Sequence, residues 1–173
     1  VRALGILPDT RLAGVSRLYA TRPVGVRDQP DFCNAVVAID VPSGSDPQVG
    51  ALALLAALKQ LEGALGRRPG ERWGPREIDL DLLLLGDHVV GTGRPDGRWL
   101  EVPHPRMRER LFVLAPLADL AAELRPPGWS ETVVAAAEAR RRVEGSDAVK
   151  PIGSWEPGAE RWTSQRAIRS PRR

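Results

Sequence analysis

The segment from Glu71 to Leu85 changes from a polar loop into an apolar strand, and this change constrains how the chain can fold. Its first half contains arginines, a tryptophan and a Gly-Pro pair, whereas its second half is apolar except at Asp79 and Asp81. Successive side chains of a strand point to opposite faces, so both aspartates are expected on one face and the isoleucine and leucines on the other. The segment therefore predicts a strand with one core face and one acidic face.

Two neighbouring carboxylates suggest a site for a hard cation. Such carboxylates repel each other and are costly to bury, whereas Mg²⁺ is commonly held by one or two carboxylates together with substrate phosphates. Arg72 and Arg76 lie just upstream, where guanidinium groups can pair with phosphate oxygens. From spacing alone, an edge strand with a charged outer face explains the pattern equally well.

The composition favours one domain in a reducing compartment. The chain has 173 residues, of which 42% are hydrophobic, and this is enough for a substantial core. A single cysteine, Cys33, argues against a disulfide framework and against a thiolate metal cluster. No apolar run reaches the length of a membrane span, and no signal-peptide pattern opens the chain. We therefore expect a cytoplasmic protein without a membrane partner.

The positive charge is concentrated at the C-terminal end. The formal net charge is +3 and the pI is about 9.7, but residues 161–173 contain five arginines and no acidic residue. Without them, 20 basic residues stand against 22 acidic ones. Aromatic residues make up only 5% of the chain, too few to suggest a base-stacking surface. Nucleic-acid binding is therefore not expected as the main function.

The order of predicted elements indicates an α+β fold. Alternation and β-branched residues predict strands at Arg11–Tyr19 and Asn34–Val41, and leucine spacing predicts a helix over 48–65 that is capped by Ser45 or Asp46. Further helices are expected at 109–124, interrupted near Pro116, and at 131–142. This mixture predicts helices on one face of a largely antiparallel sheet. Residues 1–143 would form the domain, and residues 144–173, rich in Gly, Pro, Ser and Arg, a disordered tail.

Several common catalytic patterns are missing from the sequence. There is no Gly-x-x-x-x-Gly-Lys phosphate loop, and no Gly-x-Gly-x-x-Gly motif follows a strand. With only His88, His104 and one cysteine, zinc hydrolysis is poorly supported. Phosphate binding would therefore depend on a carboxylate-held metal and on scattered arginines.

Three motifs together resemble those of the 6-hydroxymethyl-7,8-dihydropterin pyrophosphokinase family of folate biosynthesis. The first is Arg72-Trp73-Gly74-Pro75-Arg76 followed by Asp79-Leu80-Asp81. The second is Asp28-Gln29-Pro30-Asp31-Phe32 with Asn34, and the third is Val102-Pro103-His104-Pro105 with Met107, Arg110 and Phe112. The resemblance covers roughly residues 4–142. It implies a ferredoxin-like α/β sandwich that transfers pyrophosphate from ATP to the pterin alcohol and releases AMP.

The resemblance also implies roles on the ATP side of the site. Asp79 and Asp81 would hold two Mg²⁺ ions, and Arg67 and Arg76 would neutralise the transferring group. Arg72 and Trp73 would belong to a loop that covers ATP, and His104 and Arg110 would bind its triphosphate. Glu62 resembles a residue that helps to bind nucleotide or to support the site. Trp99 stands where the family often has an arginine, a role that the adjacent Arg98 would have to take.

On the pterin side, the resemblance implies that Phe32 and Phe112 sandwich the ring. Asn34 and Thr21 would hydrogen-bond its polar edge, and Val24 would pack beside it. Each residue also has an ordinary structural explanation. The two phenylalanines fit a core, Asn34 a turn, Glu62 a solvated helix position, and His104 a structural hydrogen bond between prolines.

The start of the chain departs from the family pattern. The family begins with a strand that ends in Gly-Ser-Asn, whereas this sequence begins near the end of the following helix. The expected domain therefore lacks its first strand, and we expect this chain alone to be poorly active. Two alternatives follow: a catalytically impaired domain that still binds pterin or nucleotide, and one half of a bifunctional folate enzyme that contacts other enzymes of the pathway.

Overall fold

The computed structural model describes residues 1–21, 31–42, 44–66, 78–94, 97 and 99–164. Its first half contains helix α1 (Arg2–Gly5), strands β1 (Arg11–Val15), β2 (Leu18–Thr21), β3 (Phe32–Asn34) and β4 (Val37–Asp40), and helix α2 (Pro47–Ala64). Its second half contains strands β5 (Val90–Gly93) and β6 (Trp99–Val102), the 3₁₀ helix η1 (Met107–Glu109), helices α3 (Leu111–Ala121) and α4 (Val133–Glu144), and strands β7 (Val149–Glu156) and β8 (Arg161–Ser164). The expected α+β class is confirmed.

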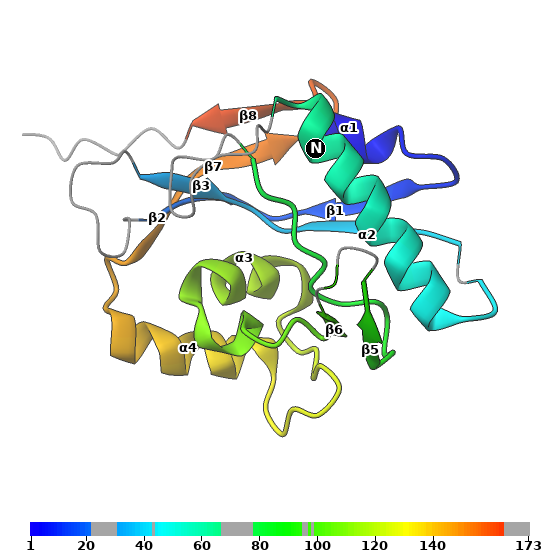
Figure 1. Cartoon of the computed structure of the whole chain (residues 1–173). Coiled ribbons are helices and arrows are strands. Elements are labelled where there is room, and N and C mark those ends of the chain that lie inside the picture. The colour runs from blue at the N-terminus through cyan, green and yellow to red at the C-terminus, as the bar shows by residue number, and fades with distance from the viewer. Residues whose placement is uncertain (22–30, 43, 67–77, 95–96, 98, 165–173) are drawn as a thin grey trace, which may run out of the picture.

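Every strand pair in the described part of the chain is antiparallel. The main sheet has the order β3-β2-β7-β8, and two further pairs are β1-β4 and β5-β6. Figure 1 shows α3 and α4 together on one side of the main sheet, with α2 near the β1–β4 pair. The contacts between elements agree with this arrangement, because α3 lies against β2, β3 and β7, and Val37 of β4 packs in the same apolar cluster as α2.

The expected strand Arg11–Tyr19 is divided into β1 and β2. Ser16 lies in the break and is only 2% exposed. Its Oγ accepts a hydrogen bond from the Val36 amide at 2.9 Å and donates one to the Arg17 carbonyl at 2.8 Å. These bonds satisfy the Val36 amide and the Arg17 carbonyl at the point where the chain passes from the β1–β4 pair to the main sheet. The expected second strand is divided in the same region, into β3 and β4.

Helix α2 begins close to the predicted position. Of the two candidate caps, Asp46 is the one used, because its carboxylate accepts hydrogen bonds from the amides of Gln48 and Val49. Its apolar side buries Ala51, Leu55 and Leu58 in the first apolar cluster. Its last turns lie next to the segment that contains the two aspartates, because Lys59 and Glu62 hydrogen-bond Leu80.

Helix α3 continues through Pro116, contrary to the predicted interruption. Leu111 and Leu114, in the first turn of α3, are fully buried against α4 and the sheet. This packing outweighs the free-energy cost of a proline inside the helix. Helix α4 begins after Thr132, which caps it through its hydroxyl, instead of after Ser130. Within the described residues, no helix is long and apolar enough to cross a membrane.

The prediction of a disordered tail is wrong for residues 149–164. They form β7 and β8, and β7 adds to the free edge of β2 with Val149 only 3% exposed. Trp155 and Trp162 face each other across the hairpin in an edge-to-face contact with 5.3 Å between ring centroids. An otherwise open edge of β2 gains backbone hydrogen bonds, which explains why this polar segment is ordered. Residues 165–173 lie outside the described part of the chain.

Candidate active site

The two aspartates lie on one face of an extended segment, as the alternation predicted. Asp79 and Asp81 are exposed, whereas Leu80 packs against the first apolar cluster and Leu82 is buried in it. The expected strand itself is not present, because residues 78–85 join no ladder among the described strands. A ladder needs a neighbouring strand, and here side chains supply part of the missing hydrogen bonding.

Those side chains belong to α2. The Leu80 amide donates to Glu62 Oε1 at 2.6 Å, and Lys59 Nζ donates to the Leu80 carbonyl at 3.0 Å. Lys59 Nζ also bonds Glu62 Oε1 at 2.7 Å. Sequence reasoning selected Glu62 but missed Lys59. The i,i+3 spacing of the two residues on one helix was the available signal.

His104 is placed by the backbone on both of its sides. Its amide donates to the Leu83 carbonyl at 2.8 Å, and its Nδ1 accepts a hydrogen bond from the Arg106 amide at 3.1 Å. A neutral imidazole that accepts at Nδ1 has its proton on Nε2, so Nε2 can donate to a ligand. Burial lowers the pKa of His104; the nearby Asp81 carboxylate raises it in part and Arg110 lowers it further.

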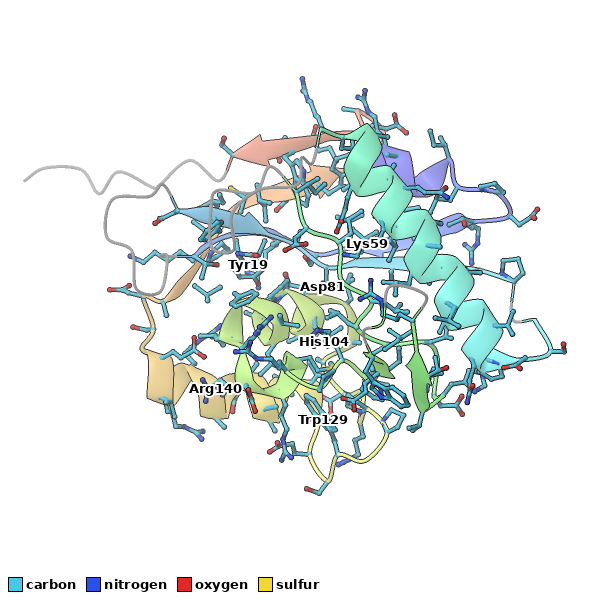
Figure 2. All side chains as sticks on the ribbon, in the orientation of Figure 1. Tyr19, Lys59, Asp81, His104, Trp129 and Arg140 are labelled. Atoms are coloured by element: carbon cyan, nitrogen blue, oxygen red, sulfur yellow. The ribbon has the colours of Figure 1, made fainter. Side chains whose placement is uncertain are left out.

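Arg110 lies near the same carboxylate. It precedes the first residue of α3, and its guanidinium lies 5.5 Å from the centroid of the Phe112 ring. Burial and the neighbouring Arg106 lower the pKa of Arg110, while Asp81 and Glu109 oppose the change. A guanidinium remains protonated in proteins, so a positive charge stands beside the aromatic ring. Figure 2 shows Asp81 and His104 in the region between α2 and α3.

A second set of predicted residues meets at the end of β2 and β3. Asn34 Nδ2 donates to Thr21 Oγ1 at 2.7 Å, and Thr21 is directly opposite Phe32 in the ladder. Phe32 is 44% exposed, which is unusual for a large aromatic side chain. Phe112, in the helix that contacts β3, is partly buried between two apolar clusters. The structure thus brings an amide–hydroxyl pair and an accessible ring to one end of the sheet.

An ionic network fixes α3 to β2. Asp119 accepts hydrogen bonds from the Arg17 guanidinium and backbone amide and from the Tyr19 hydroxyl. Burial alone would raise the pKa of Asp119, but these hydrogen bonds lower it. Burial, followed by the hydrogen bond to Asp119, raises the pKa of Tyr19 to about 12. No local pattern predicts this contact, because 102 positions separate Arg17 from Asp119.

Some predicted residues cannot be placed. Val24, Arg67, Arg72, Trp73, Arg76 and Arg98 lie outside the described residues. Trp99, at the expected arginine position, is 63% exposed in β6, and its indole lies near Gly91 of the neighbouring strand.

The described donor groups suit a cation that takes only part of its coordination from protein. No group of three or more His, Cys, Asp and Glu side chains that could hold a metal occurs in the described ranges. Two exposed carboxylates on one face are hard oxygen donors, and Mg²⁺ often keeps water and substrate phosphate as its other ligands. The pair therefore fits Mg²⁺ and does not fit a protein-enclosed zinc centre.

An α+β domain that gathers paired carboxylates, a half-buried histidine and an arginine defines a class of candidate phosphate-binding proteins. The family model described as 7,8-dihydro-6-hydroxymethylpterin-pyrophosphokinase (HPPK) matches residues 1–122. The chain therefore belongs to the HPPK family. All the site residues predicted from the sequence lie within this match, whereas α4, β7 and β8 follow it.

Similar proteins have consistent names. A 2-amino-4-hydroxy-6-hydroxymethyldihydropteridine pyrophosphokinase from Pseudomonas aeruginosa is 47% identical over 121 residues, which are 70% of this chain and 68% of that protein. A Bacillus subtilis protein of the same name is 44% identical over 67% of this chain and 63% of its own length. A pea protein named folate synthesis bifunctional protein, mitochondrial, is 48% identical over 60% of this chain but 18% of its own length.

Proposed function

We propose that this chain transfers the pyrophosphoryl group of ATP to the hydroxymethyl oxygen of 6-hydroxymethyl-7,8-dihydropterin and releases AMP. Family membership supports the reaction class. The observation that carries the proposal is that the His104 amide donates to the Leu83 carbonyl at 2.8 Å, which places His104 beside the segment that contains Asp81. Arg110 lies close enough to Asp81 for their charges to interact. A carboxylate for a cation and two donors for phosphate oxygens therefore occupy one region of a pyrophosphokinase-family domain.

Asp79 and Asp81 are the proposed ligands of Mg²⁺, with two ions in the complete complex. Both side chains are exposed on one face, where phosphate and water can complete the coordination. When bound, the cations would neutralise phosphate charge and orient the transferring group.

The triphosphate would be bound by His104 and Arg110. The Nε2–H of neutral His104 can donate to a phosphate oxygen, and the Arg110 guanidinium can pair with another. We assign Arg67 and Arg76 to charge neutralisation of the transferring group, and Arg72 and Trp73 to contacts with ATP. Glu62 would act on the ATP side through the backbone that it binds.

The pterin would lie at the ends of β2 and β3. Thr21 and Asn34 already hydrogen-bond each other and could exchange this contact for the polar edge of the ring. Phe32 and Phe112 would stack on its faces, and Val24 would pack beside it. An Arg110 guanidinium above Phe112 would join the two halves of the site.

The proposed reaction is an in-line displacement. The hydroxymethyl oxygen forms a bond to the β-phosphorus of ATP while the bond from that phosphorus to the α–β bridging oxygen breaks, and the hydroxyl proton passes to solvent. AMP leaves with the bridging oxygen. Positioning and charge stabilisation supply most of the catalysis in such transfers, so a strong general base is not required.

The direct test is AMP formation by the purified chain. AMP that requires both the pterin alcohol and Mg²⁺ would support the proposal. If neither this chain nor a version extended at its N-terminus forms AMP while pterin still binds, the proposed activity is wrong and a binding domain is favoured. Rescue by the extension alone would support the expectation that an additional strand is needed.

Two further assignments accompany this proposal. Residues 1–143 contain every side chain assigned to the reaction, and we propose that β7 and β8 support them through β2 and through the packing of β7 against α3. The name of the pea relative motivates a contact with another folate-pathway enzyme, which co-purification with such an enzyme would test. The exposed free thiol of Cys33 fits a reducing compartment, and we propose the cytoplasm.

A further inference from the structure

The backbone between the two aspartates is held by two side chains of one helix. The Leu80 amide belongs to the peptide group that joins it to Asp79, and it donates to Glu62 Oε1 at 2.6 Å. The Leu80 carbonyl belongs to the peptide group that joins it to Asp81, and it accepts from Lys59 Nζ at 3.0 Å. The two peptide groups that determine the directions of the aspartate side chains are therefore both anchored to α2.

Lys59 and Glu62 also hydrogen-bond each other, and Glu62 is shielded from water. Lys59 Nζ lies 2.7 Å from Glu62 Oε1, so three hydrogen bonds connect the lysine, the glutamate and Leu80. Glu62 is 1% exposed, while 32% of the Lys59 side chain remains accessible. A buried carboxylate is costly unless it is paired and hydrogen-bonded, and here both conditions are met.

Apolar packing alone does not explain a carboxylate at this position. Glu62 continues the buried side of α2 that contains Ala51, Leu55 and Leu58, where a leucine would fill the space at no electrostatic cost. A glutamate differs from a leucine here because it can accept a hydrogen bond from the Leu80 peptide, which has no strand partner among the described residues. A leucine at position 62 would leave the Leu80 amide without this acceptor, which costs free energy in a buried setting.

We propose that Lys59 and Glu62 are positioning residues, which hold Asp79 and Asp81 in the orientation that binds a divalent cation. This inference rests on the proposed function, since it assigns the pair to the same reaction. Two neighbouring carboxylates repel each other, and an untethered segment can relax to separate them. Fixing the peptide on each side of Leu80 keeps both carboxylates on one face before the cation arrives, and such preorganisation strengthens metal binding.

The test compares substitutions at position 62 with a control one turn away on the same helix. Glu62→Leu removes the acceptor for the Leu80 amide, Glu62→Gln keeps an acceptor oxygen, and Leu58→Ala removes only core packing. Leu58 is 7% exposed in the first apolar cluster and has no part in the three hydrogen bonds. The full chain is studied in each case, with Mn²⁺ and a non-hydrolysable ATP analogue as probes.

Three readouts separate positioning from simple stability. Electron paramagnetic resonance gives the affinity for Mn²⁺, NMR gives amide hydrogen exchange at Leu80, and AMP formation gives kcat and KM. We expect Glu62→Leu to weaken Mn²⁺ binding about tenfold or more, which is typical for residues that orient metal ligands. It should also accelerate Leu80 exchange and lower kcat more than it changes the KM for pterin. Glu62→Gln should recover most of each effect.

Leu58→Ala should lower the melting temperature while leaving Mn²⁺ affinity and Leu80 exchange unchanged. If Glu62→Leu folds and matches Leu58→Ala in all three readouts, the pair is only structural and the inference is overturned. If Glu62→Leu does not fold, the double variant Lys59→Met/Glu62→Gln decides, because it breaks the bond to the Leu80 carbonyl without leaving an unpaired buried charge. Unchanged Mn²⁺ affinity in that variant also overturns the inference. A wild-type chain that forms no AMP contradicts the proposed function, yet Mn²⁺ affinity and Leu80 exchange still decide the role of the pair.

Discussion

The hydroxyl of Tyr19 in β2 lies 3.0 and 2.9 Å from the two carboxylate oxygens of Asp119 in α3. The Arg17 guanidinium binds the same carboxylate, with its terminal nitrogen 2.6 Å from Oδ1. One carboxylate therefore joins the sheet to the helix that begins with Leu111 and Phe112. Because Thr21 follows Tyr19 by two residues in the same strand, this network also fixes the distance between the two sides of the proposed pterin site.

The first prediction concerns the ionisation of Tyr19, the single tyrosine of the chain. Burial and the hydrogen bond to Asp119 raise its pKa to about 12, above the unfolded value near 10. The neutral phenol is thus favoured in the fold, so its stabilising contribution is present below pH about 10 and is lost as pH rises through about 12. Ultraviolet absorbance of the phenolate measures the titration directly.

Asp119→Asn is the matched variant for this titration. It removes the carboxylate that accepts a hydrogen bond from the Tyr19 hydroxyl and leaves Arg17 beside the phenol, so the pKa of Tyr19 should fall. A wild-type phenol that titrates at its ordinary pKa would contradict the geometry of the network.

The second prediction concerns Asp81. Its side chain is exposed, so Asp81→Ala should change the free energy of unfolding by no more than about 0.5 kcal/mol. The same substitution should abolish turnover, because it removes a proposed Mg²⁺ ligand. AMP formation and thermal unfolding test the two statements separately.

Asp87→Ala is a suitable control, since Asp87 is also an exposed aspartate but lies in a turn after the extended segment. It should retain wild-type turnover. Mg²⁺-dependent AMP release by Asp81→Ala would refute the metal assignment.

The third prediction concerns the hydrogen bond between Thr21 and Asn34. Thr21→Val removes the hydroxyl that accepts from Asn34 Nδ2 in the free chain and that would hydrogen-bond the pterin edge in the complex. A lost hydrogen bond of about 1 kcal/mol corresponds to a rise of several-fold in the KM for pterin, with the KM for ATP unchanged. Thr10→Val, at a half-buried threonine whose hydroxyl donates to the nearby Pro8 carbonyl, should change neither constant. Equal changes in both KM values would argue against a pterin-specific role.

Local patterns predicted those features whose causes are local in the sequence. Alternation placed Asp79 and Asp81 on one face, and Asp46 supplied the expected helix cap. The hydrogen bonds that join Leu80 to Lys59 and to Glu62 cross 21 and 18 positions and depend on the angle between a helix and an extended segment. No periodicity contains that information.

Residues 149–164 show a different limit of sequence patterns. Pro151 and Gly153 interrupt the alternation that would identify a strand, and the partner β2 lies about 130 positions earlier. The edge of β2 determines that this segment becomes a strand, because its unpaired backbone groups gain partners there. Tertiary contact also overrode a local rule at Pro116, which stays inside a helix whose neighbours are buried.

The last prediction tests whether the C-terminal hairpin stabilises the domain. Gly153 of β7 lies between Leu18 of β2 and Ser164 of β8 in the sheet. A Cβ at this position would come 2.6 Å from the carbonyl oxygen of Thr163, a backbone atom that cannot move without disturbing the ladder. Gly153→Ala should therefore lower the free energy of unfolding by about 1–3 kcal/mol, as overpacking usually does.

Gly158→Ala provides the comparison within the same hairpin. Nothing lies within 4 Å of a Cβ built at Gly158, so this variant should differ from the wild type by no more than about 0.5 kcal/mol. Urea unfolding followed by tryptophan fluorescence measures both variants, since Trp155 and Trp162 report on the hairpin and Trp129 on the part near α4. If Gly153→Ala moves only the hairpin signal, β7 and β8 unfold independently and do not support β2. A shared shift of all signals means that the hairpin and the domain unfold as one unit, in which case β7 stabilises the strand that presents Thr21.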